Sequence, residues 1–392
     1  MSSKPRILFV SHAATRNGAT ILLLNTLRWL RARDEFEIEI LVHGRGELLG
    51  EFEAIGRTTV WRNPGGLLEG FPKGIREAWM PRFETAGLKL LTAGRRWDLI
   101  YVNTAAVWRD VPFLAKRSRH VLWHIHEMGY ALRLLIGEER GREMFRLPSR
   151  FVVVSESVRD TLKDDFGVGV ERMDVINGSV TVPKVTDEMH REKRRQILEQ
   201  FGWPESTFVV GACGAMGWRK GTDVFLQIAR EMTGTKPDSD VRFLWIGGAA
   251  KGDEALRFEQ EARLFGIEDR CRSVPTTGDV MDYYMAMDVF ALTSREDPYP
   301  LVMLEAGAFH VPTVCFARSG GGPEYVGKDA GLIAPYLDVQ AFASHLETLR
   351  KSPEARSRMG AAAAEKVRSR HVIGTQGPKI LASIQRCLGS EK

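Results

Sequence analysis

The sequence contains little that would mark a secreted, membrane-embedded or metal-binding protein. Its 392 residues include four cysteines, none in a C-x-x-C pair: Cys213, Cys271, Cys315 and Cys387. Cysteines so scattered argue against a disulfide framework and against a zinc site. No apolar run approaches the roughly 18 residues of a membrane span, and no signal-peptide hydrophobic segment follows Met1. We therefore expect a cytoplasmic protein with reduced thiols.

Composition and length favour a folded protein of several domains. Hydrophobic residues make up 44% and charged residues 27%, which excludes a disordered chain, a collagen and a coiled coil. At roughly 150 residues per domain, the length predicts two or three domains.

The net charge of +5 comes from residues 1–180, which carry 27 Lys and Arg against 22 Asp and Glu. No basic run has the length or the aromatic interleaving of a nucleic-acid site, so no nucleic-acid partner is expected. The excess favours an anionic small molecule or an anionic membrane surface, with a solvated face as the plain alternative.

Strand-like and helical segments alternate along nearly the whole chain, which indicates parallel sheets with helices on both faces. The predicted strands are Arg6–Ser11, Phe36–Val42, Asp98–Asn103, His120–His126, Phe151–Ser155, Asp174–Ile176, Phe208–Cys213, Arg242–Gly247, Arg270–Val274, Asp288–Leu292, Pro312–Phe316 and Gly331–Ala334. The predicted helices include Ala19–Arg33, Thr222–Met232, Asp253–Phe265, Val280–Met287 and Pro300–Phe309.

Pro183 and Pro204 interrupt this alternation. We therefore expect a first domain over residues 1–180, a linker with a charged helix over 181–206, and a second domain over 207–372. The tail, residues 353–392, is predicted to be helical throughout, with Ala361–Ala364 as a strong helix-forming run.

In each half of the chain, a loop follows the first predicted strand and leads into a helix. The free N–H groups at the start of such a helix can bind anions. In the first half Gly18 lets the backbone approach a phosphate without a Cβ in the way. In the second half Arg219 and Lys220 stand between a glycine-rich turn and a helix. Two cations so placed repel each other and the helix dipole, so a diphosphate would neutralise them; a solvated Arg–Lys pair is the alternative. Neither loop has the G-x-G-x-x-G of a dinucleotide site.

Asp297 and Glu305 lie at the start of a further predicted helix. Eight helical residues turn through about 800°, which leaves the two carboxylates about 80° out of phase. They share a target only if Asp297 lies in the loop ahead of the helix, as Pro298 and Pro300 favour. Paired in this way they suit the vicinal hydroxyls of a sugar or ribose. Alternatively, Asp297 caps the helix and Glu305 forms a buried ion pair.

A histidine pair ends the predicted strand over 120–126. Alternation places His124 and His126 on one face and aims His126 at the ligand side. A metal site needs a third ligand, and none is spaced nearby. Contact with a polar sugar is favoured, with a buried structural histidine as the alternative.

In their order along the chain, these motifs resemble the retaining glycosyltransferases of family 4. The matching segments of the second half are Gly214–Gly221, Phe243–Gly248, Thr277–Val280, Asp288–Phe290, Ser294–Ala308 and Gly320–Glu324. The looser matches of the first half are Asn17–Ala19, Tyr101–Asn103, His126–Glu127 and Val153–Ser157.

The resemblance implies an α/β fold of the GT-B class, with two Rossmann-like doubly wound parallel-sheet domains facing a central cleft. The first domain would take the acceptor and the second the nucleotide-sugar, and the helix over 373–392 would cross back to the first. The enzyme would transfer a sugar from a nucleotide-diphosphate co-substrate to a glycan or lipid-linked acceptor, with retention at the anomeric carbon. No metal or cofactor would be needed. The reaction would belong to bacterial surface polysaccharide or glycolipid synthesis. The basic and aromatic residues interleaved over 62–96 suit docking on anionic lipid headgroups at the inner face of the plasma membrane, with an ordinary amphipathic helix packed on its own domain as the alternative.

The resemblance also assigns roles to residues. Lys220 and Arg219 would hold the diphosphate, Glu305 the ribose, and Asp297 and His126 the transferred sugar, so that the implied catalytic set is His126, Arg219, Lys220 and Asp297. Further donor contacts would come from Gly18, Gly217, Thr277, Gly278, Glu296, Tyr299, Pro300, Leu301 and Val302. Weaker acceptor contacts would come from Asn17, Asn103 and His124.

Two positions depart from the family pattern. The family often has an Arg where this chain has Gly214, and the first acid of its E-x7-E motif is here Asp297, one methylene shorter. A non-catalytic nucleotide- or glycan-binding relative is therefore one alternative. A nucleotide-sugar 2-epimerase, a different enzyme class on the same fold, is another. No residue distinguishes UDP, GDP, ADP and dTDP donors.

Overall fold

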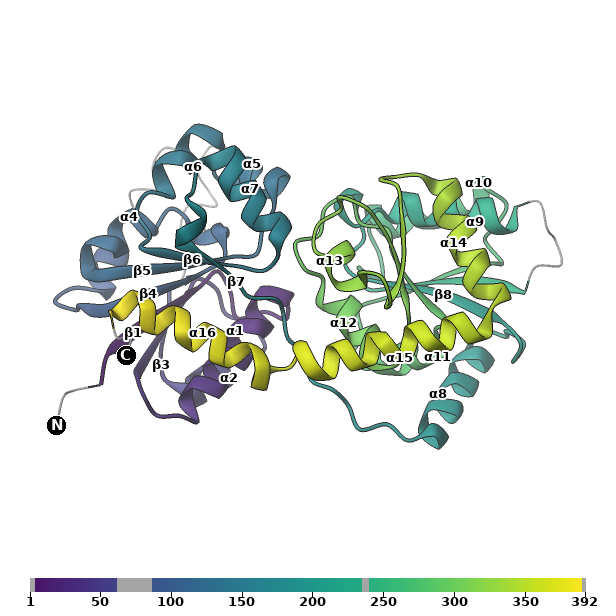
Figure 1. The fold of residues 1–392 in the computed structure, drawn as a ribbon, viewed down its shortest axis with the longest axis horizontal. Coiled ribbons are helices and arrows are strands. Elements are labelled where there is room, and N and C mark those ends of the chain that lie inside the picture. Colours follow the sequence, from purple (N-terminus) through teal and green to yellow (C-terminus); the bar gives the residue numbers. More distant parts are fainter. Residues whose placement is uncertain (1–3, 62–86, 235–239, 390–392) are drawn as a thin grey trace. The chain divides into compact units, whose positions relative to one another are not determined.

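The computed structural model describes residues 4–61, 87–234 and 240–389, which form two compact units (Figure 1). The described residues of 1–177 and 373–392 make up unit 1, and those of 178–372 make up unit 2. The basic, aromatic stretch expected at a membrane falls mostly outside the described residues; this applies to Arg62, Phe71, Lys73, Arg76, Trp79, Arg82 and Phe83. No helix within the described ranges is both long and apolar enough to cross a bilayer.

Unit 1 is built on a parallel sheet with the strand order β3-β2-β1-β4-β5-β6-β7. Its strands are β1 (Arg6–Ser11), β2 (Glu37–Val42), β3 (Arg57–Val60), β4 (Trp97–Asn103), β5 (Ser118–Ile125), β6 (Arg150–Val153) and β7 (Met173–Val175). Its α-helices are α1 (Gly18–Arg31), α2 (Leu49–Ile55), α4 (Val111–Leu114), α5 (Gly129–Leu135), α6 (Glu138–Met144), α7 (Glu156–Phe166) and α16 (Ile373–Leu388), and its 3-10 helices are η2 (Ala105–Val107), η3 (Ala115–Arg117) and η4 (Val170–Arg172).

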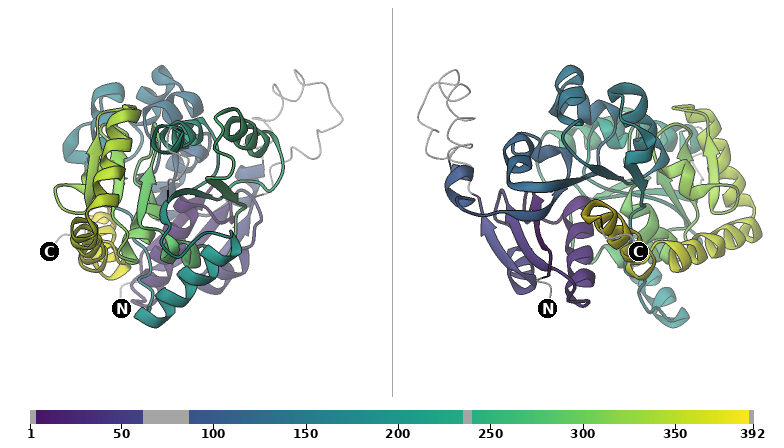
Figure 2. Two further views of the ribbon diagram at one scale, coloured as in Figure 1. Left: turned by 90° about the vertical axis from the view of Figure 1, so that its right-hand side faces the viewer. Right: turned by 60° about the vertical axis from the view of Figure 1, so that its left-hand side comes forward.

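The last helix of the chain completes unit 1. In Figure 1 and in the right-hand view of Figure 2, α16 lies beside α1. Ile380 and Ile384 are buried in the same apolar cluster as the residues of β1 and α1. Gly377 makes the close approach feasible, because a Cβ at that position would stand 2.6 Å from the Trp29 ring. Burial of this apolar face holds the C-terminal helix to a sheet whose last strand, β7, ends at Val175, far earlier in the chain.

Unit 2 is built on a parallel sheet with the strand order β10-β9-β8-β11-β12-β13. Its strands are β8 (Phe208–Cys213), β9 (Val241–Ile246), β10 (Cys271–Val274), β11 (Val289–Leu292), β12 (Thr313–Phe316) and β13 (Gly331–Ala334). Its helices are α8 (Asp187–Gln200), α9 (Thr222–Thr233), α10 (Asp253–Leu264), α11 (Val280–Ala286), α12 (Leu301–Ala308), α13 (Gly322–Val326), α14 (Val339–Lys351) and α15 (Pro353–Arg370), with the 3-10 turn η5 (Trp218–Lys220).

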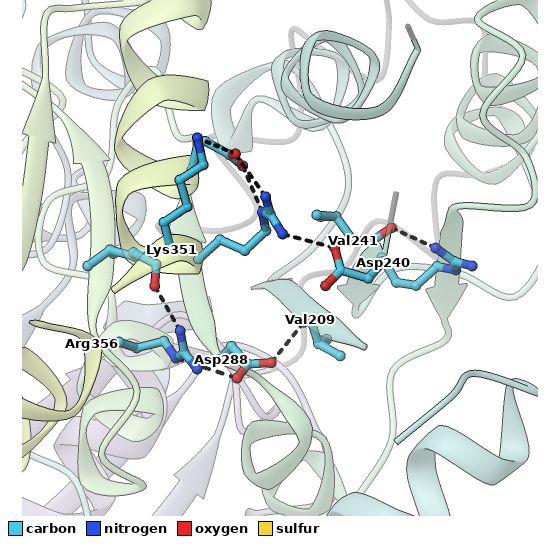
Figure 3. A network of polar contacts seen from close by, with 10 residues as sticks. Val209, Asp240, Val241, Asp288, Lys351 and Arg356 are labelled. Atoms are coloured by element: carbon cyan, nitrogen blue, oxygen red, sulfur yellow. Dashed lines mark hydrogen bonds and ion pairs between the residues drawn. The ribbon is translucent and has the colours of Figure 1, made fainter. Parts of the chain in front are cut away.

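A polar network fastens the amino-terminal edge of the unit 2 sheet (Figure 3). Asp288, just ahead of β11, accepts a hydrogen bond from the Val209 N–H at 2.9 Å. It also pairs with Arg194 of α8 at 3.1 Å and with Arg356 of α15 at 3.6 Å. Residues 187–200, expected within a linker, thus form a helix that is tied to the sheet of unit 2.

The structure confirms the predicted pair of doubly wound parallel sheets, and most predicted elements agree with it to within two residues. The short strand β3 was not predicted, because four residues at the edge of the described sheet leave little periodicity to detect. Several helices were not predicted either: α2, α4, α5, α6, α7, α13 and α14. The prediction of a continuous helical tail was wrong: α15 ends at Arg370, and a break at His371 and Val372 precedes α16.

Candidate functional site

The strand order of each sheet reverses at one point, between β1 and β4 in unit 1 and between β8 and β11 in unit 2. In open α/β sheets, ligands bind beyond the carboxyl ends of the strands at this switch point. The glycine-rich turn follows β8, and the loop with Asp297 follows β11. Two motifs that lie 77 residues apart in the chain are therefore neighbours in unit 2.

The turn after β8 depends on its glycines. Gly214 and Gly217 have φ values of +143° and +146°, which side chains of L-residues rarely adopt. A Cβ at Gly221 would lie 2.1 Å from the Thr293 carbonyl oxygen, so only glycine permits this contact with the end of β11. A Cβ at Gly214 would also stand 3.2 Å from Cε of Lys220. The aliphatic part of the Lys220 side chain therefore packs directly against Gly214.

Lys220 and Asp297 form the charged centre of the unit 2 site. The Lys220 Nζ donates a hydrogen bond to Oδ2 of Asp297 at 2.5 Å, and both side chains are largely buried. Ser294 Oγ donates to the same oxygen at 3.2 Å. Asp297 does lie in the loop ahead of α12, where its N–H donates to the Ser319 carbonyl at 2.7 Å. It neither caps the helix nor points away from the basic turn.

Arg219 and Glu296 flank this pair. Arg219 donates to the Glu296 carbonyl at 3.0 Å, and its guanidinium lies 3.8 Å from the Asp297 carboxylate. The Arg219 carbonyl in turn accepts the Arg295 N–H at 2.9 Å. Backbone and side-chain contacts therefore hold the loops after β8 and β11 together, with Arg219 as the more exposed of the two cations.

Glu305 projects from α12 toward α11, not toward a cation. Its Oε2 accepts a hydrogen bond at 2.8 Å from the hydroxyl of Tyr284, which is fully buried. Burial raises the pKa of Glu305, and the hydrogen bond from Tyr284 opposes that rise. The predicted alternative of a buried ion pair is not what the structure shows.

Three further segments border the unit 2 site. Thr277 and Gly278 lie in the loop after β10, which is tied to the end of β9 because Thr276 N–H donates to the Gly248 carbonyl at 3.1 Å. Leu301 and Val302 form the first turn of α12, with Pro300 ahead of them. The side chain of Tyr299 is buried, and its Oη lies 3.4 Å from Nε2 of His371. A ligand could therefore contact only the backbone of Tyr299.

In unit 1 the predicted residues also gather at the carboxyl edge of the sheet. Asn17 caps α1, its Oδ1 accepting the Thr20 N–H at 3.1 Å, and places Gly18 at the helix start. Asn103, the last residue of β4, donates to the Ala19 carbonyl at 3.1 Å. Its Oδ1 lies 2.9 Å from His126 Nε2. The structure thus brings Asn17, Gly18, Asn103 and His126 together.

His124 lies behind His126, with 4.0 Å between the ring centroids. It is 5% exposed, and its Nδ1 lies 2.7 Å from the Tyr101 hydroxyl. Burial and the neighbouring His12 lower the pKa of His126 to about 3, and burial also lowers the pKa values of His124 and His12. Neutral imidazoles therefore line this edge at physiological pH, and they suit hydrogen bonds to hydroxyl groups.

Because burial keeps His12, His124 and His126 neutral, we expect the free energy of unfolding of unit 1 to fall as the pH falls below about 6.5. Unfolded histidines protonate near 6.5, whereas folded His126 stays neutral until about pH 3, so the unfolded state binds more protons in between. Each such histidine changes the free energy of unfolding by up to about 1.4 kcal/mol per pH unit. We expect His126→Asn to flatten the pH dependence of urea unfolding between pH 6.5 and 4. An unchanged slope would contradict a neutral buried imidazole at this position.

Several residues at these edges were given no role from the sequence, although Ser294 and Glu127 stand in segments that match the family. Tyr284 and Ser294 contact the two carboxylates of unit 2. In unit 1, Glu127 accepts the N–H groups of Ala105 and His126, both at 3.0 Å. Serine and tyrosine on buried elements give no local signal, since their partners are distant in sequence. The described residues include no group of three His, Cys, Asp or Glu placed to hold a metal ion.

Family models match both units. The model described as "Glycosyltransferase Family 4" matches residues 16–182, and the model described as "Glycosyl transferases group 1" matches residues 193–366. A D-inositol 3-phosphate glycosyltransferase of Corynebacterium urealyticum is 31% identical over 87% of this chain and 84% of its own length. The chain belongs to the group 1 glycosyltransferases.

Among solved structures, Anabaena Alr3699/HepE in complex with UDP-glucose has a TM-score of 0.79 and 19% identity over 97% of this chain and 100% of that one. Sucrose-phosphate synthase from Thermosynechococcus elongatus has a TM-score of 0.77 and 18% identity, covering 99% of this chain and 100% of that one. Both likenesses support the GT-B fold.

Other alignments with the family are shorter. The D-inositol 3-phosphate glycosyltransferase of Corynebacterium kroppenstedtii is 29% identical over 54% of this chain and 48% of its own length. The chain thus spans about half the length of several curated relatives that it matches.

Proposed function

We propose that this group 1 glycosyltransferase moves a sugar from a nucleotide-diphosphate donor to a hydroxyl of a glycan or lipid-linked acceptor, with retention at the anomeric carbon. The observation that carries the proposal is the joined pair of loops in unit 2, where Lys220 and Asp297 meet at the switch point of the sheet. That the solved relative Alr3699/HepE binds UDP-glucose supports a nucleotide-sugar as the donor.

The charge arrangement suits departure of a diphosphate. Negative charge grows on the leaving phosphate as the anomeric C–O bond breaks, and preorganised donors that meet this charge lower the barrier. Lys220 and Arg219 supply two cations, and the first turn of α12 supplies free N–H groups and the positive end of its dipole. On this proposal the positive charge comes from the protein and no metal ion is needed.

The carboxylates act as hydroxyl binders in this mechanism. Glu305 would accept hydrogen bonds from the ribose, and Asp297 would orient the transferred sugar while it balances the charge of Lys220. The acceptor hydroxyl would attack from the face that the diphosphate leaves, and a departing phosphate oxygen would take its proton. His126, neutral and close to Asn103, would hydrogen-bond a sugar hydroxyl.

Thermal-shift measurements with UDP-, GDP-, ADP- and dTDP-sugars, each with and without a chelator, test this proposal. We expect one base to raise the midpoint by several degrees, since a ligand at 100 times its Kd stabilises by about 2.7 kcal/mol. The shift should persist with chelator and disappear in Glu305→Ala. Lys351→Ala, which removes an exposed ion pair on α14, is the control and should keep it. No shift with any nucleotide would overturn the proposal.

A further inference from the structure

A buried tyrosine on a neighbouring helix holds the carboxylate that we assign to the ribose. Tyr284 belongs to α11 and Glu305 to α12, and neither helix contributes to the glycine-rich turn. The Tyr284 ring is fully buried and lies 6.4 Å from that of Phe290 and 6.0 Å from that of Phe309, between ring centroids. A side chain packed in this way cannot move its hydroxyl, which donates to Glu305 Oε2 at 2.8 Å.

This contact decides which carboxylate atoms face a ligand. Oε2 is engaged by the tyrosine, whereas Oε1 has no hydrogen-bond partner among the described residues. Each carboxylate oxygen can accept about two hydrogen bonds, so an ionised Glu305 keeps capacity for two vicinal hydroxyls. Without the contact to Tyr284, the Glu305 carboxylate could accept as many hydrogen bonds, but its oxygens would not be held in one orientation.

A third group lies near this pair. The thiol of Cys213, the last residue of β8 and the neighbour of Gly214, is close enough to Glu305 and Lys220 for their charges to act on it, and burial raises its pKa to about 11. Among the described titratable groups, Tyr284 and Cys213 interact with Glu305, and Lys220 acts on the Cys213 thiol.

We infer that Tyr284 is a positioning residue which fixes the Glu305 carboxylate for the ribose, so that the site selects ribonucleotides over their 2′-deoxy counterparts. The inference rests on the proposed function, because it takes Glu305 as the ribose ligand. The sequence does not distinguish UDP, GDP, ADP and dTDP donors, and this inference separates the last from the others. Donors built on 2′-deoxyribose, such as dTDP-sugars, would bind more weakly than ribonucleotide donors.

The experiment compares the Kd values of UDP, GDP and ADP with those of their 2′-deoxy forms by calorimetry, for the full chain and three variants. In the wild type we expect the preferred ribonucleotide to bind at least tenfold more tightly than its deoxy form. Tyr284→Phe should weaken ribonucleotide binding about tenfold and deoxynucleotide binding much less, which brings the ratio toward one. Tyr283→Phe, a neighbouring tyrosine on α11, is the matched control and should leave both Kd values unchanged.

A pH series separates positioning from mere packing. The tyrosine hydrogen bond favours the ionised form of Glu305, so its loss raises the pKa of that carboxyl further. We expect the pH below which ribonucleotide binding fails to move upward in Tyr284→Phe. A packing defect would weaken binding equally at all pH values and for both sugars, and that result would overturn the inference.

Glu305→Gln distinguishes the two proposals. If this variant loses the ribose preference while Tyr284→Phe keeps it, the positioning role is wrong and the donor site stands. If Glu305→Gln binds ribonucleotides as the wild type does, the ribose assignment itself fails. If Tyr284→Phe does not fold, Glu305→Asp tests the same contact, because the shortened carboxylate can no longer meet the Tyr284 hydroxyl in the same place. We expect this variant to lose the ribose preference, and an unchanged preference would overturn the inference.

Discussion

Replacing Lys220 with Met is expected to lower the rate of sugar transfer by about 10²–10³-fold. This is the effect found on removing one preorganised donor from a developing negative charge. Lys220 is suited to such a role because its ammonium is held by Asp297 and Gly214 leaves room for its chain. Arg219→Met should cost less, about tenfold, because its side chain is 42% exposed and its charge is screened by solvent.

Single-turnover measurement of donor consumption, well below the melting temperature, checks this prediction. Stability needs its own control, since Lys220→Met leaves the buried Asp297 carboxylate without its cation. The double variant Lys220→Met/Asp297→Asn should recover the melting temperature without recovering the rate. Lys351→Met, which breaks an exposed pair with Glu347, should leave the rate unchanged. A loss below about threefold in Lys220→Met would show that this lysine does not meet the leaving group.

Trp245→Ala is expected to destabilise unit 2 by about 3–5 kcal/mol, the usual cost of deleting a buried aromatic side chain. Trp245 of β9 is 1% exposed, and its ring meets that of Phe225 edge-on at 5.3 Å. Its indole Nε1 also donates to the Gly214 carbonyl at 3.0 Å. The same side chain therefore fills the core and anchors the start of the glycine-rich turn.

Calorimetry should show the midpoint falling by roughly 6–20 °C, as expected for a unit of this size. Trp245→Phe keeps most of the ring but leaves the Gly214 carbonyl without its donor, so we expect a smaller loss of about 1–3 kcal/mol. Trp218→Ala is the matched control: that ring is 56% exposed, and its loss should cost under about 1 kcal/mol. Equal effects at Trp245 and Trp218 would contradict the packing described for unit 2.

Much of this architecture could be predicted from the sequence, because its main elements are strongly periodic. β8 and α9 were predicted almost to the residue, since a continuous apolar run precedes a glycine-rich turn and an amphipathic segment follows it. The position of Asp297 ahead of α12 followed from helix phase and two prolines. The order of the motifs identified the family that the comparisons confirm.

The sequence by itself therefore determined the two α/β units, the family and the residue types available at each strand end. Only the tertiary structure decided which strand ends are neighbours. Buried parallel strands all have similar, nearly continuous hydrophobic sequences. Their pattern shows that a residue is buried, but it does not show which strand or side chain lies next to it. The pairing of β8 with β11 brings Lys220 to Asp297. Likewise, the packing of α11 against α12 brings the Tyr284 hydroxyl to Glu305, a contact that no local pattern encodes.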